Sequence, residues 1–265
     1  MITTNGHTQL LKLVSGKAYK FADLFAVGAS GIALPSSATN LDFGWATCAV
    51  TDSYVDEAMN QVVFHGTLPA ELAGNIAEIG LVSQSDEFIR TGLPNALVFA
   101  FEPKELWFSD TNYDITNTGS IGANNYKFTD AVVGNYLAKT TSNINISRYD
   151  TAKFKVNSSG TGSVRLILKN DELNYAYKDF TLAAGENILS ANISTFTKVG
   201  SFNPTEIFEI RFEVKAVQSS TNTLEFDAMN LSSSANGGLV ARSPLAITQF
   251  KRTGATMELE YAVAL

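Results

Sequence analysis

Hydrophobic and polar residues alternate with a period of two along most of this chain. The clearest case is residues 207–214, where apolar side chains occupy one face and Glu209, Arg211 and Glu213 occupy the other. This period is typical of a half-buried strand, and it recurs at 61–65, 163–169 and 256–263. Because clusters of Gly, Asn and Ser separate these short segments, the pattern predicts an all-β fold built as a sandwich.

Two segments show a helical pattern instead. Residues 16–27 have apolar side chains at spacings that suit two helical turns. Residues 69–79 begin with Pro69 at a first helical position and carry Glu71 in the first turn, although Gly74 interrupts the pattern. We therefore expect two short helices beside the strands.

The composition changes at two places, which suggests a domain inserted into another. An apolar run at 96–101 gives way to sequence rich in Asp, Thr and Asn, and a Ser/Asn/Gly linker spans 232–238. The tail after that linker, about 28 residues, is too short to fold alone. We predict a β-sandwich domain formed by both chain ends, 1–107 with 237–265, and an inserted β-sandwich jelly roll, 108–236.

The C-terminal tail itself is predicted to form two strands joined by a tight turn. Lys251 and Arg252 lie at the tip of this predicted hairpin, and we interpret them as solvated turn residues. The last residues, 261–265, are almost wholly apolar. Because an apolar terminus is normally docked, we expect this end to be buried in a sheet or a subunit interface.

Composition and charge exclude several classes of function. The formal charge of −7 argues against binding to nucleic-acid phosphate or to anionic lipid. One Cys and two His leave no disulfide framework and no Cys- or His-based metal site. No apolar run is long enough for a membrane span, and the N-terminus lacks the features of a signal peptide. We expect a protein that neither binds nucleic acid nor inserts into a membrane.

No group of residues with catalytic spacing is present. Glu209 and Glu213 share one strand face, but four residues separate them by about 13 Å. This distance is too long for the carboxylate pair of a glycosidase. We therefore predict a protein that is not an enzyme and that has no cofactor.

The order of segments in the second half of the chain resembles a known family. A strand at 175–182 is followed by a Gly-Glu-Asn turn at 185–187, a Phe-x-x-x-Gly element at 196–200, and an alternating strand at 206–215. A closing strand at 224–231 contains an internal Asp. This order is similar to the closing half of carbohydrate-binding-module and galactose-binding-like jelly rolls. The resemblance implies a jelly roll and a glycan ligand.

Sugar recognition needs exposed aromatic rings that stack on the apolar side of a pyranose, with amide or carboxylate groups that pair with hydroxyls. Tyr175 and Tyr177 share one strand face, which we interpret as packed against the sandwich. The aromatic residues near turns are better candidates. The predicted glycan-binding residues are Tyr113, Tyr126, Tyr136, Asn124 and Asn125.

Three carboxylates are candidates for a structural calcium ion. Asp110, Asp114 and Asp227 lie on the first and last strands of the insert, where oxygen ligands clip many related jelly rolls. The segment that starts at Asp110 lacks the Gly and the distal Glu of a calcium loop. The alternative is a turn capped by Asx hydrogen bonds.

A second resemblance lies in the N-terminal half. A strand ending in Phe-x-Gly-x-Leu-Pro at 64–69 is followed by Ile-x-Glu-Ile-Gly-Leu at 76–81, a polar turn, and an Arg. This order resembles a motif of tailed-bacteriophage virion proteins, in which a strand like 257–265 closes the domain. The resemblance implies a virion location, a symmetric homo-oligomer and other virion proteins as partners. The motif residues are Ile76, Glu78, Ile79, Gly80, Leu81 and Arg90.

Glu78 stands between apolar neighbours in this motif. A buried carboxylate needs a partner, for which Arg90 and Arg242 are both candidates, and an exposed Glu78 on one strand face is the alternative. Gly80 suggests a bend at which a side chain would clash.

These observations lead to one main prediction and one alternative. The main prediction is a non-enzymatic phage virion structural protein that assembles into a symmetric oligomer on the tail or capsid and displays the jelly roll for adhesion to host-surface glycan. The alternative is a stand-alone carbohydrate-binding module or an accessory domain of a glycan-active enzyme.

Overall fold

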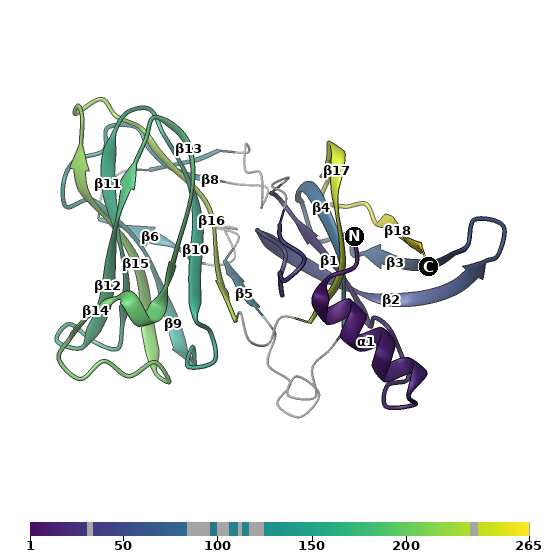
Figure 1. Cartoon of the computed structure of the whole chain (residues 1–265). Helices are drawn as coiled ribbons and strands as arrows, with labels where there is room; N and C mark the ends of the chain where they lie inside the picture. Colours follow the sequence, from purple (N-terminus) through teal and green to yellow (C-terminus); the bar gives the residue numbers. More distant parts are fainter. Residues whose placement is uncertain are drawn as a thin grey trace. The chain divides into compact units, whose positions relative to one another are not determined.

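A computed structural model of the chain describes residues 1–30, 34–83, 96–99, 106–110, 113–116, 125–233 and 238–264. The chain divides into two compact units. Unit 1 comprises Met1–Asn95 with Ser234–Leu265, and unit 2 comprises Ala96–Ser233. Both units consist mainly of antiparallel strands, so the predicted all-β class is confirmed (Figure 1). None of the helices in the described part of the chain is long and apolar enough to cross a membrane.

Unit 1 is one antiparallel sheet of six strands with a helix beside it. The strand order is β17-β4-β1-β2-β3-β18, so the C-terminal strand is one edge of the sheet. Its pairing with β3 confirms that the apolar C-terminal segment docks in a sheet. The elements are α1 (Thr4–Val14), β1 (Leu24–Gly28), β2 (Gly44–Asp56), β3 (Gln61–Leu68), β4 (Gly74–Val82), β17 (Leu239–Lys251) and β18 (Met257–Ala264).

The long strand β2 changes partner halfway along its length. Its first half pairs with β1 and its second half pairs with β3. At this point Phe25 of β1 and the backbone of β2 approach Gly66 of β3 closely, because Gly66 has no side chain. A Cβ atom there would lie 2.7 Å from Cδ2 of Phe25 and 2.8 Å from the carbonyl oxygen of Ala49.

Substitution of Gly66 by Ala is therefore expected to destabilise unit 1. The added methyl group must displace a buried ring and a backbone oxygen, which we expect to cost about 1–3 kcal/mol. Gly44→Ala is the matched control, because its Cβ would meet its nearest neighbour, Leu41, at an ordinary 3.5 Å. Urea titrations of the two variants measure the difference, and equal midpoints would contradict this explanation.

The helix of unit 1 lies outside both segments predicted to be helical. The hydroxyl oxygen of Thr3 caps α1 by accepting a hydrogen bond from the amide of Gly6 at 3.1 Å. The same hydroxyl donates to the carbonyl oxygen of Leu239, which ties the helix start to β17. The Thr cap is the sequence signal that could have located this helix.

Both helical predictions are wrong. Residues 16–23 form turns and bends that lead into β1, which holds the rest of the first segment. Residues 69–73 form a turn that leads into β4, which holds the rest of the second. After Pro69 the chain makes only one tight turn, in which the amide of Leu72 donates to the Pro69 carbonyl oxygen at 3.3 Å. Gly74 then starts a strand at φ 154°. Strand pairing on both sides of β4 outweighs the helical spacing of its apolar residues.

Lys251, interpreted from the sequence as a solvated turn residue, is buried. Only 1% of this residue is exposed. Its ammonium group donates to the carbonyl oxygens of Leu72 at 2.8 Å, Ala255 at 2.6 Å and Arg252 at 3.3 Å. The cation therefore joins the turn after β3 to the turn between β17 and β18, whereas Arg252 itself is exposed.

Unit 2 is a sandwich of two antiparallel sheets (Figure 1). One sheet has the order β13-β10-β16-β8-β7, with β5 also paired to β16, and the other has the order β14-β12-β11-β15-β9-β6. The elements are β5 (Ala96–Phe99), β6 (Phe108–Ser109), β7 (Asp114–Thr116), β8 (Asn125–Phe128), β9 (Tyr136–Ile144), β10 (Thr151–Ser158), β11 (Gly162–Lys169), β12 (Tyr175–Leu182), β13 (Gly185–Asn192), η2 (Ile193–Thr195), β14 (Thr197–Val199), β15 (Ile207–Val217) and β16 (Leu224–Ser232).

Aromatic rings from both sheets meet between the layers of unit 2. Phe154 of β10 lies 4.9 Å, centroid to centroid, from both Phe180 of β12 and Phe212 of β15. Phe212 also contacts Phe226 of β16 at 5.1 Å. Because alternate residues of each strand enter this core, the intervening residues of β12, β11 and β15 must point outward.

Candidate functional site

The outward side chains of β12, β11, β15 and β9 form a dense polar and aromatic surface, which we call the outer face. On β12, Ala176, Phe180 and Leu182 are buried in the core, whereas Tyr175 and Tyr177 point outward and are half-buried. Their ring centroids lie 6.1 Å apart. The two tyrosines do share one strand face, but the interpretation that this face packs against the sandwich is wrong.

Strand register brings the residues of the outer face into rows. In one row, Arg165 is the partner of Asp179 on β12 and of Glu213 on β15, and Glu213 is in turn the partner of Tyr136 on β9. In the next row, Ile167 is the partner of Tyr177 and of Arg211. Side chains of paired residues point to the same face of a sheet, so these groups are neighbours.

Two guanidinium groups lie over two tyrosine rings on this face. The Cζ atom of Arg165 is 3.9 Å from the ring centroid of Tyr177, and that of Arg211 is 4.1 Å from the ring centroid of Tyr136. Each stack is a cation–π contact. β12 and β9 are separated by three strand spacings, about 14 Å. The outer face therefore carries two separate, ordered aromatic positions.

Carboxylates hold both guanidinium groups in place. Nε and Nη2 of Arg165 donate to the two oxygens of Asp179 at 2.6 and 2.8 Å. Nε of Arg211 donates to Oε1 of Glu209 at 2.7 Å. The bidentate pair of Arg165 and Asp179 fixes the plane of the guanidinium group as well as its position.

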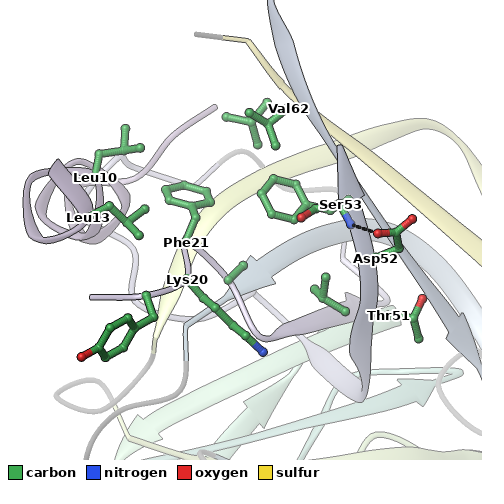
Figure 2. A pocket seen from close by; sticks show the side chains of 13 residues that line it. Leu10, Leu13, Lys20, Phe21, Thr51, Asp52, Ser53 and Val62 are labelled. Carbon is green, nitrogen blue, oxygen red and sulfur yellow. Dashed lines mark hydrogen bonds between the residues drawn. The ribbon is translucent and has the colours of Figure 1, made fainter. Parts of the chain in front are cut away.

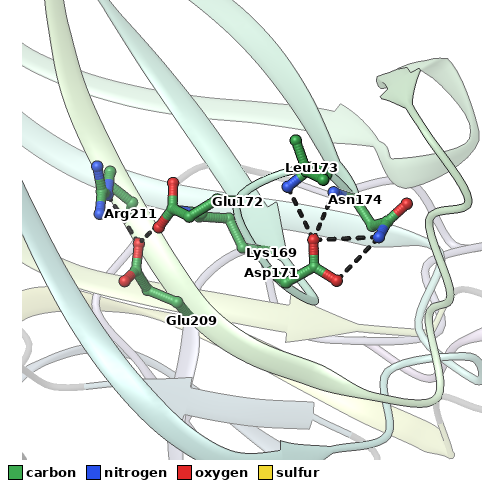
Figure 3. Close-up of polar contacts among 7 residues, drawn as sticks. All are labelled: Lys169, Asp171, Glu172, Leu173, Asn174, Glu209 and Arg211. Atoms are coloured by element: carbon green, nitrogen blue, oxygen red, sulfur yellow. Dashed lines mark hydrogen bonds and ion pairs between the residues drawn. The ribbon is translucent and has the colours of Figure 1, made fainter.

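A network of charged side chains continues to the end of the sheet, at the turn between β11 and β12 (Figure 3). Nζ of Lys169 lies 2.6 Å from Glu172 and 3.5 Å from Glu209. Asp171 accepts hydrogen bonds from the side chain of Asn174 and from the amides of Leu173 and Asn174, and these bonds lower the pKa of Asp171. The polar groups of Asp171 and Glu172 in this turn therefore already have hydrogen-bond or ion-pair partners.

The outer face is balanced in charge. Each of its four cations lies within 3 Å of a carboxylate. The pairs are Arg165 with Asp179, Lys169 with Glu172, Arg211 with Glu209, and Lys215 with Glu213. A face of this kind offers donors and acceptors without a net field, which suits a neutral polar ligand better than a polyanion.

The Arg165–Asp179 pair makes a pH-dependent contribution to stability. The guanidinium holds the pKa of Asp179 below its ordinary value. A lowered pKa in the folded state stabilises the protein above the ordinary pKa of Asp, near 4, and this contribution is lost as the pH falls through the lowered value. Because the Asp179 side chain is 50% exposed, we expect less than about 1 kcal/mol.

The expected result is a small stability difference that disappears in acid. Asp179→Asn is predicted to be less stable than the wild type at neutral pH, with the difference shrinking below about pH 4. Denaturant titrations at several pH values measure it. Arg165→Met removes the same pair from the other side and should give the same pH profile, whereas a difference that grows in acid would contradict the assignment.

The residues predicted to bind glycan do not form one group. Tyr136 lies on the outer face and is half-buried, with the guanidinium of Arg211 stacked on one side of its ring. Tyr126 and Asn125 lie in β8 of the other sheet and are buried, with 3% and 6% exposed. The ring of Tyr126 packs against Tyr113, with centroids 5.1 Å apart. Burial leaves Tyr126 no open ring face for a sugar.

Asn124 lies outside the described residues. Sequence reasoning also missed Arg165 and Arg211 as site residues. In the sequence, both residues are charged and occupy outward positions of alternating strands. Only the strand register shows that these positions lie beside tyrosines.

The three carboxylates proposed as calcium ligands have different surroundings. Asp110 accepts a hydrogen bond from the amide of Tyr136 at 3.1 Å, and Asp114 is exposed on β7. Asp227 is buried and lies 3.5 Å from the ammonium group of Lys155. The described residues contain no group of three His, Cys, Asp or Glu side chains suited to a metal ion. The calcium site stays a prediction.

The virion-type motif lies in β4, between β17 and β1 in unit 1. Ile76, Glu78 and Leu81 are buried, and Ile79 is half-buried. Gly80 lies in a continuous strand, not at a bend. A Cβ on Gly80 would nevertheless lie 2.6 Å from Cδ1 of Leu239, so the expected clash is real. Arg90 lies outside the described residues.

Glu78 pairs with Arg242 of β17. The Arg242 Nε and Nη2 atoms lie 2.8 and 2.7 Å from Oε2, and the amide of Phe43 donates to Oε1 at 3.0 Å. Burial raises the pKa of Glu78, while the Phe43 amide and Arg242 oppose the rise. This part of the motif stabilises the sheet of unit 1, and its role in virion assembly stays a prediction.

Comparison with known proteins gives carbohydrate-binding modules as structural neighbours. No protein-family model matches the chain, and no curated protein matches its sequence. A family 11 carbohydrate-binding module from Clostridium thermocellum, in complex with a β-1,3-1,4-mixed-linked tetrasaccharide, is similar with a TM-score of 0.37 and 12% identity. The match covers 54% of this chain and 92% of the module.

Two further modules are similar to a comparable extent. A family 6 module from Clostridium stercorarium in complex with cellobiose has a TM-score of 0.34 and 12% identity, over 52% of this chain and 94% of the module. A low-affinity xylan-binding module from Roseburia intestinalis has a TM-score of 0.36 and 16% identity, over 54% of this chain and 98% of the module. These neighbours give no support to the predicted phage virion role.

Proposed function

We propose that unit 2 is a non-catalytic carbohydrate-binding module that holds a neutral oligosaccharide on its outer face. The observation that carries the proposal is the pair of guanidinium–tyrosine stacks, Arg165 on Tyr177 and Arg211 on Tyr136. Each stack combines an aromatic ring with a planar group of hydrogen-bond donors, and these are the two kinds of group that sugar recognition requires.

The stacks also reduce the cost of binding. Arg and Tyr side chains normally lose rotamer freedom when a ligand orders them. Here the carboxylates of Asp179 and Glu209 already fix the two guanidinium groups over their rings. A ligand that lies across the face therefore meets groups that are in place, and the separation between β12 and β9 suits several linked sugars better than one.

The chemistry of the face favours binding over hydrolysis. A glycosidase acid needs a carboxyl group with a raised pKa so that it holds a proton near neutral pH. Arg165 instead lowers the pKa of Asp179, and Glu209 and Glu213 lie beside cations.

In unit 1, burial raises the pKa of the Cys48 thiol to about 11, so it is protonated and poorly nucleophilic at neutral pH.

The proposal is tested by glycan binding of the full chain. Affinity electrophoresis against a panel of neutral and anionic polysaccharides identifies a ligand, and calorimetry with its oligosaccharides measures the affinity. We expect binding to a neutral polysaccharide, with Tyr177→Ala and Tyr136→Ala each about ten-fold weaker.

Tyr19→Ala is the matched control, because Tyr19 is a fully exposed tyrosine in unit 1. It should bind like the wild type. Binding to none of the neutral polysaccharides, or equal losses in all three tyrosine variants, would overturn the proposal. Measurable hydrolysis of a bound polysaccharide would overturn its non-catalytic part.

A further inference from the structure

Unit 1 contains an apolar cleft that the proposed glycan binding does not use. The cleft has a volume of about 470 Å³ and lies between α1 and the strands β2, β3 and β18. Figure 2 shows Leu10 and Leu13 pointing from the helix toward Phe21. Phe64, Val62 and Val263 line the cleft from β3 and β18, and we call these three residues its floor. Thr51, Asp52 and Ser53 line it from β2.

The helix side of the cleft has an apolar rim. Leu11 and Val14 of α1 are 71% and 89% exposed, and Tyr19 after the helix is 98% exposed. Large apolar side chains that are this exposed and this close together mark an interaction surface more often than a solvated one.

The loop between β2 and β3 is a second exposed apolar feature of unit 1. We call residues 54–60 the hairpin tip. Tyr54, Val55 and Met59 are 48%, 62% and 68% exposed. Residues 51–55 of β2 are exposed on both faces of the strand, so this ribbon projects without cover on either face. Apolar residues on a projecting ribbon are stabilised when they pack against another surface.

The hairpin tip and the cleft are continuous. Val55 is the register partner of Val62, which lines the cleft, so both side chains point to the same face of the sheet. An apolar strip therefore runs from the floor of the cleft to the tip.

The two features also carry opposite charges. Lys20 lines the cleft, Lys12 and Lys17 lie on or just after the helix α1 that borders it, and all three lysines are exposed. Asp56 and Glu57 lie in the hairpin tip. The cleft also has two carboxylates, Asp52 in its lining and Asp23 at 3.9 Å from the ammonium group of Lys20. The three lysines outnumber them, so a net positive charge at the cleft and a negative charge at the tip favour contact between the cleft of one molecule and the tip of another.

We propose that the occupant of the cleft is the hairpin tip of a second copy of this chain. Because the tip lies beside its own cleft on the same face, a single two-fold axis places each tip in the cleft of its partner. The contact is then isologous and closes as a dimer. Val55 and Met59 enter the apolar floor, and the acidic groups of the tip face the lysines of α1.

The proposal is tested by the mass of the full chain in solution. Sedimentation velocity over a concentration series should give a species of twice 28.5 kDa. The variant with Val55→Ser and Met59→Ser should sediment as a monomer. Ile247→Ser is the matched control, because Ile247 is 73% exposed on β17 outside both features, and it should remain a dimer.

A charge exchange tests the pairing itself. Glu57→Lys and Lys17→Glu should each weaken the dimer several-fold at low salt, and the chain that carries both changes should regain most of the affinity. This recovery is not expected if either change only disturbs the fold.

Three results would overturn the proposal. The first is a wild-type monomer at every soluble concentration. The second is a dimer that survives the Val55 and Met59 changes. The third is a wild-type dimer whose cleft still takes up an apolar dye such as anilinonaphthalene sulfonate, since the hairpin tip would then not fill the cleft.

Discussion

Arg242→Met is expected to lower the free energy of unfolding of unit 1 by about 3–5 kcal/mol. The change leaves the carboxylate of Glu78 with no guanidinium partner at a position that is 0% exposed. The amides of Phe43 and Asp42 still donate to Glu78, but neutral hydrogen bonds do not replace the ion pair with Nε and Nη2 of Arg242. Guanidinium chloride unfolding measures the loss, and hydrogen exchange of the β4 amides shows whether it lies in unit 1.

Two controls separate the ion pair from loss of the arginine stem. Arg252→Met removes an exposed arginine in the turn between β17 and β18 and should change stability by less than about 0.5 kcal/mol. The double variant Glu78→Leu, Arg242→Met replaces both charges by apolar groups and should regain most of the lost stability. A double variant as unstable as Arg242→Met would show that shape, not an unpaired charge, causes the loss.

Phe212→Ala is expected to destabilise unit 2 by about 3–5 kcal/mol. Phe212 is 1% exposed and its ring contacts Phe154, Phe226 and Trp107, with centroid distances of 4.9, 5.1 and 6.2 Å. Truncation leaves a cavity between the two sheets that these rings cannot fill without leaving their own contacts.

Phe208→Ala is the matched control for this prediction. Phe208 lies in the same strand, β15, but is 50% exposed. Its truncation should cost less than about 1 kcal/mol. Denaturant unfolding with hydrogen exchange of the β11 and β15 amides measures both variants. Equal losses would mean that strand pairing, rather than the ring cluster, determines the stability of the sandwich.

Strand periodicity predicted much of the fold because it depends on neighbouring residues alone. The alternating segment 207–214 lies within β15, and 163–169 lies within β11. The C-terminal segment forms β18 as expected. In each case one face is buried by the rest of the unit, so the period of two appears directly in the sequence.

Helices were harder to predict because packing decides between similar local patterns. The segment at 69–79 has helical spacing, yet β1 and β17 pair with both edges of β4 and make it a strand. For α1 the main signal is one capping threonine, and its apolar residues are few and late in the segment.

Contacts between distant residues were the least accessible to sequence reasoning. Burial of Glu78 required a partner, and the sequence offered both Arg90 and Arg242. Arg242 is identified only by the structure, where it is the register partner of Gly80, two residues from Glu78. The candidate site has the same origin. Tyr177 and Arg165 lie on adjacent strands. The register pairs Tyr177 with Ile167, two residues from Arg165, so Arg165 is the diagonal neighbour of Tyr177 and can stack on its ring. Of the tyrosines singled out from the sequence, Tyr126 proved to be a core residue, whereas Tyr136 lies on the outer face.

The burial of Lys251 makes this residue a reporter of motion at the edge of unit 1. Amine-reactive reagents need an accessible Nζ, and the Nζ of Lys251 is buried and donates to three carbonyl oxygens. Lys12, Lys17 and Lys20 of the same unit are exposed and react directly. Acylation of Lys251 must wait until the turn between β17 and β18 opens, so its labelling rate measures how often that corner of the sheet unfolds locally.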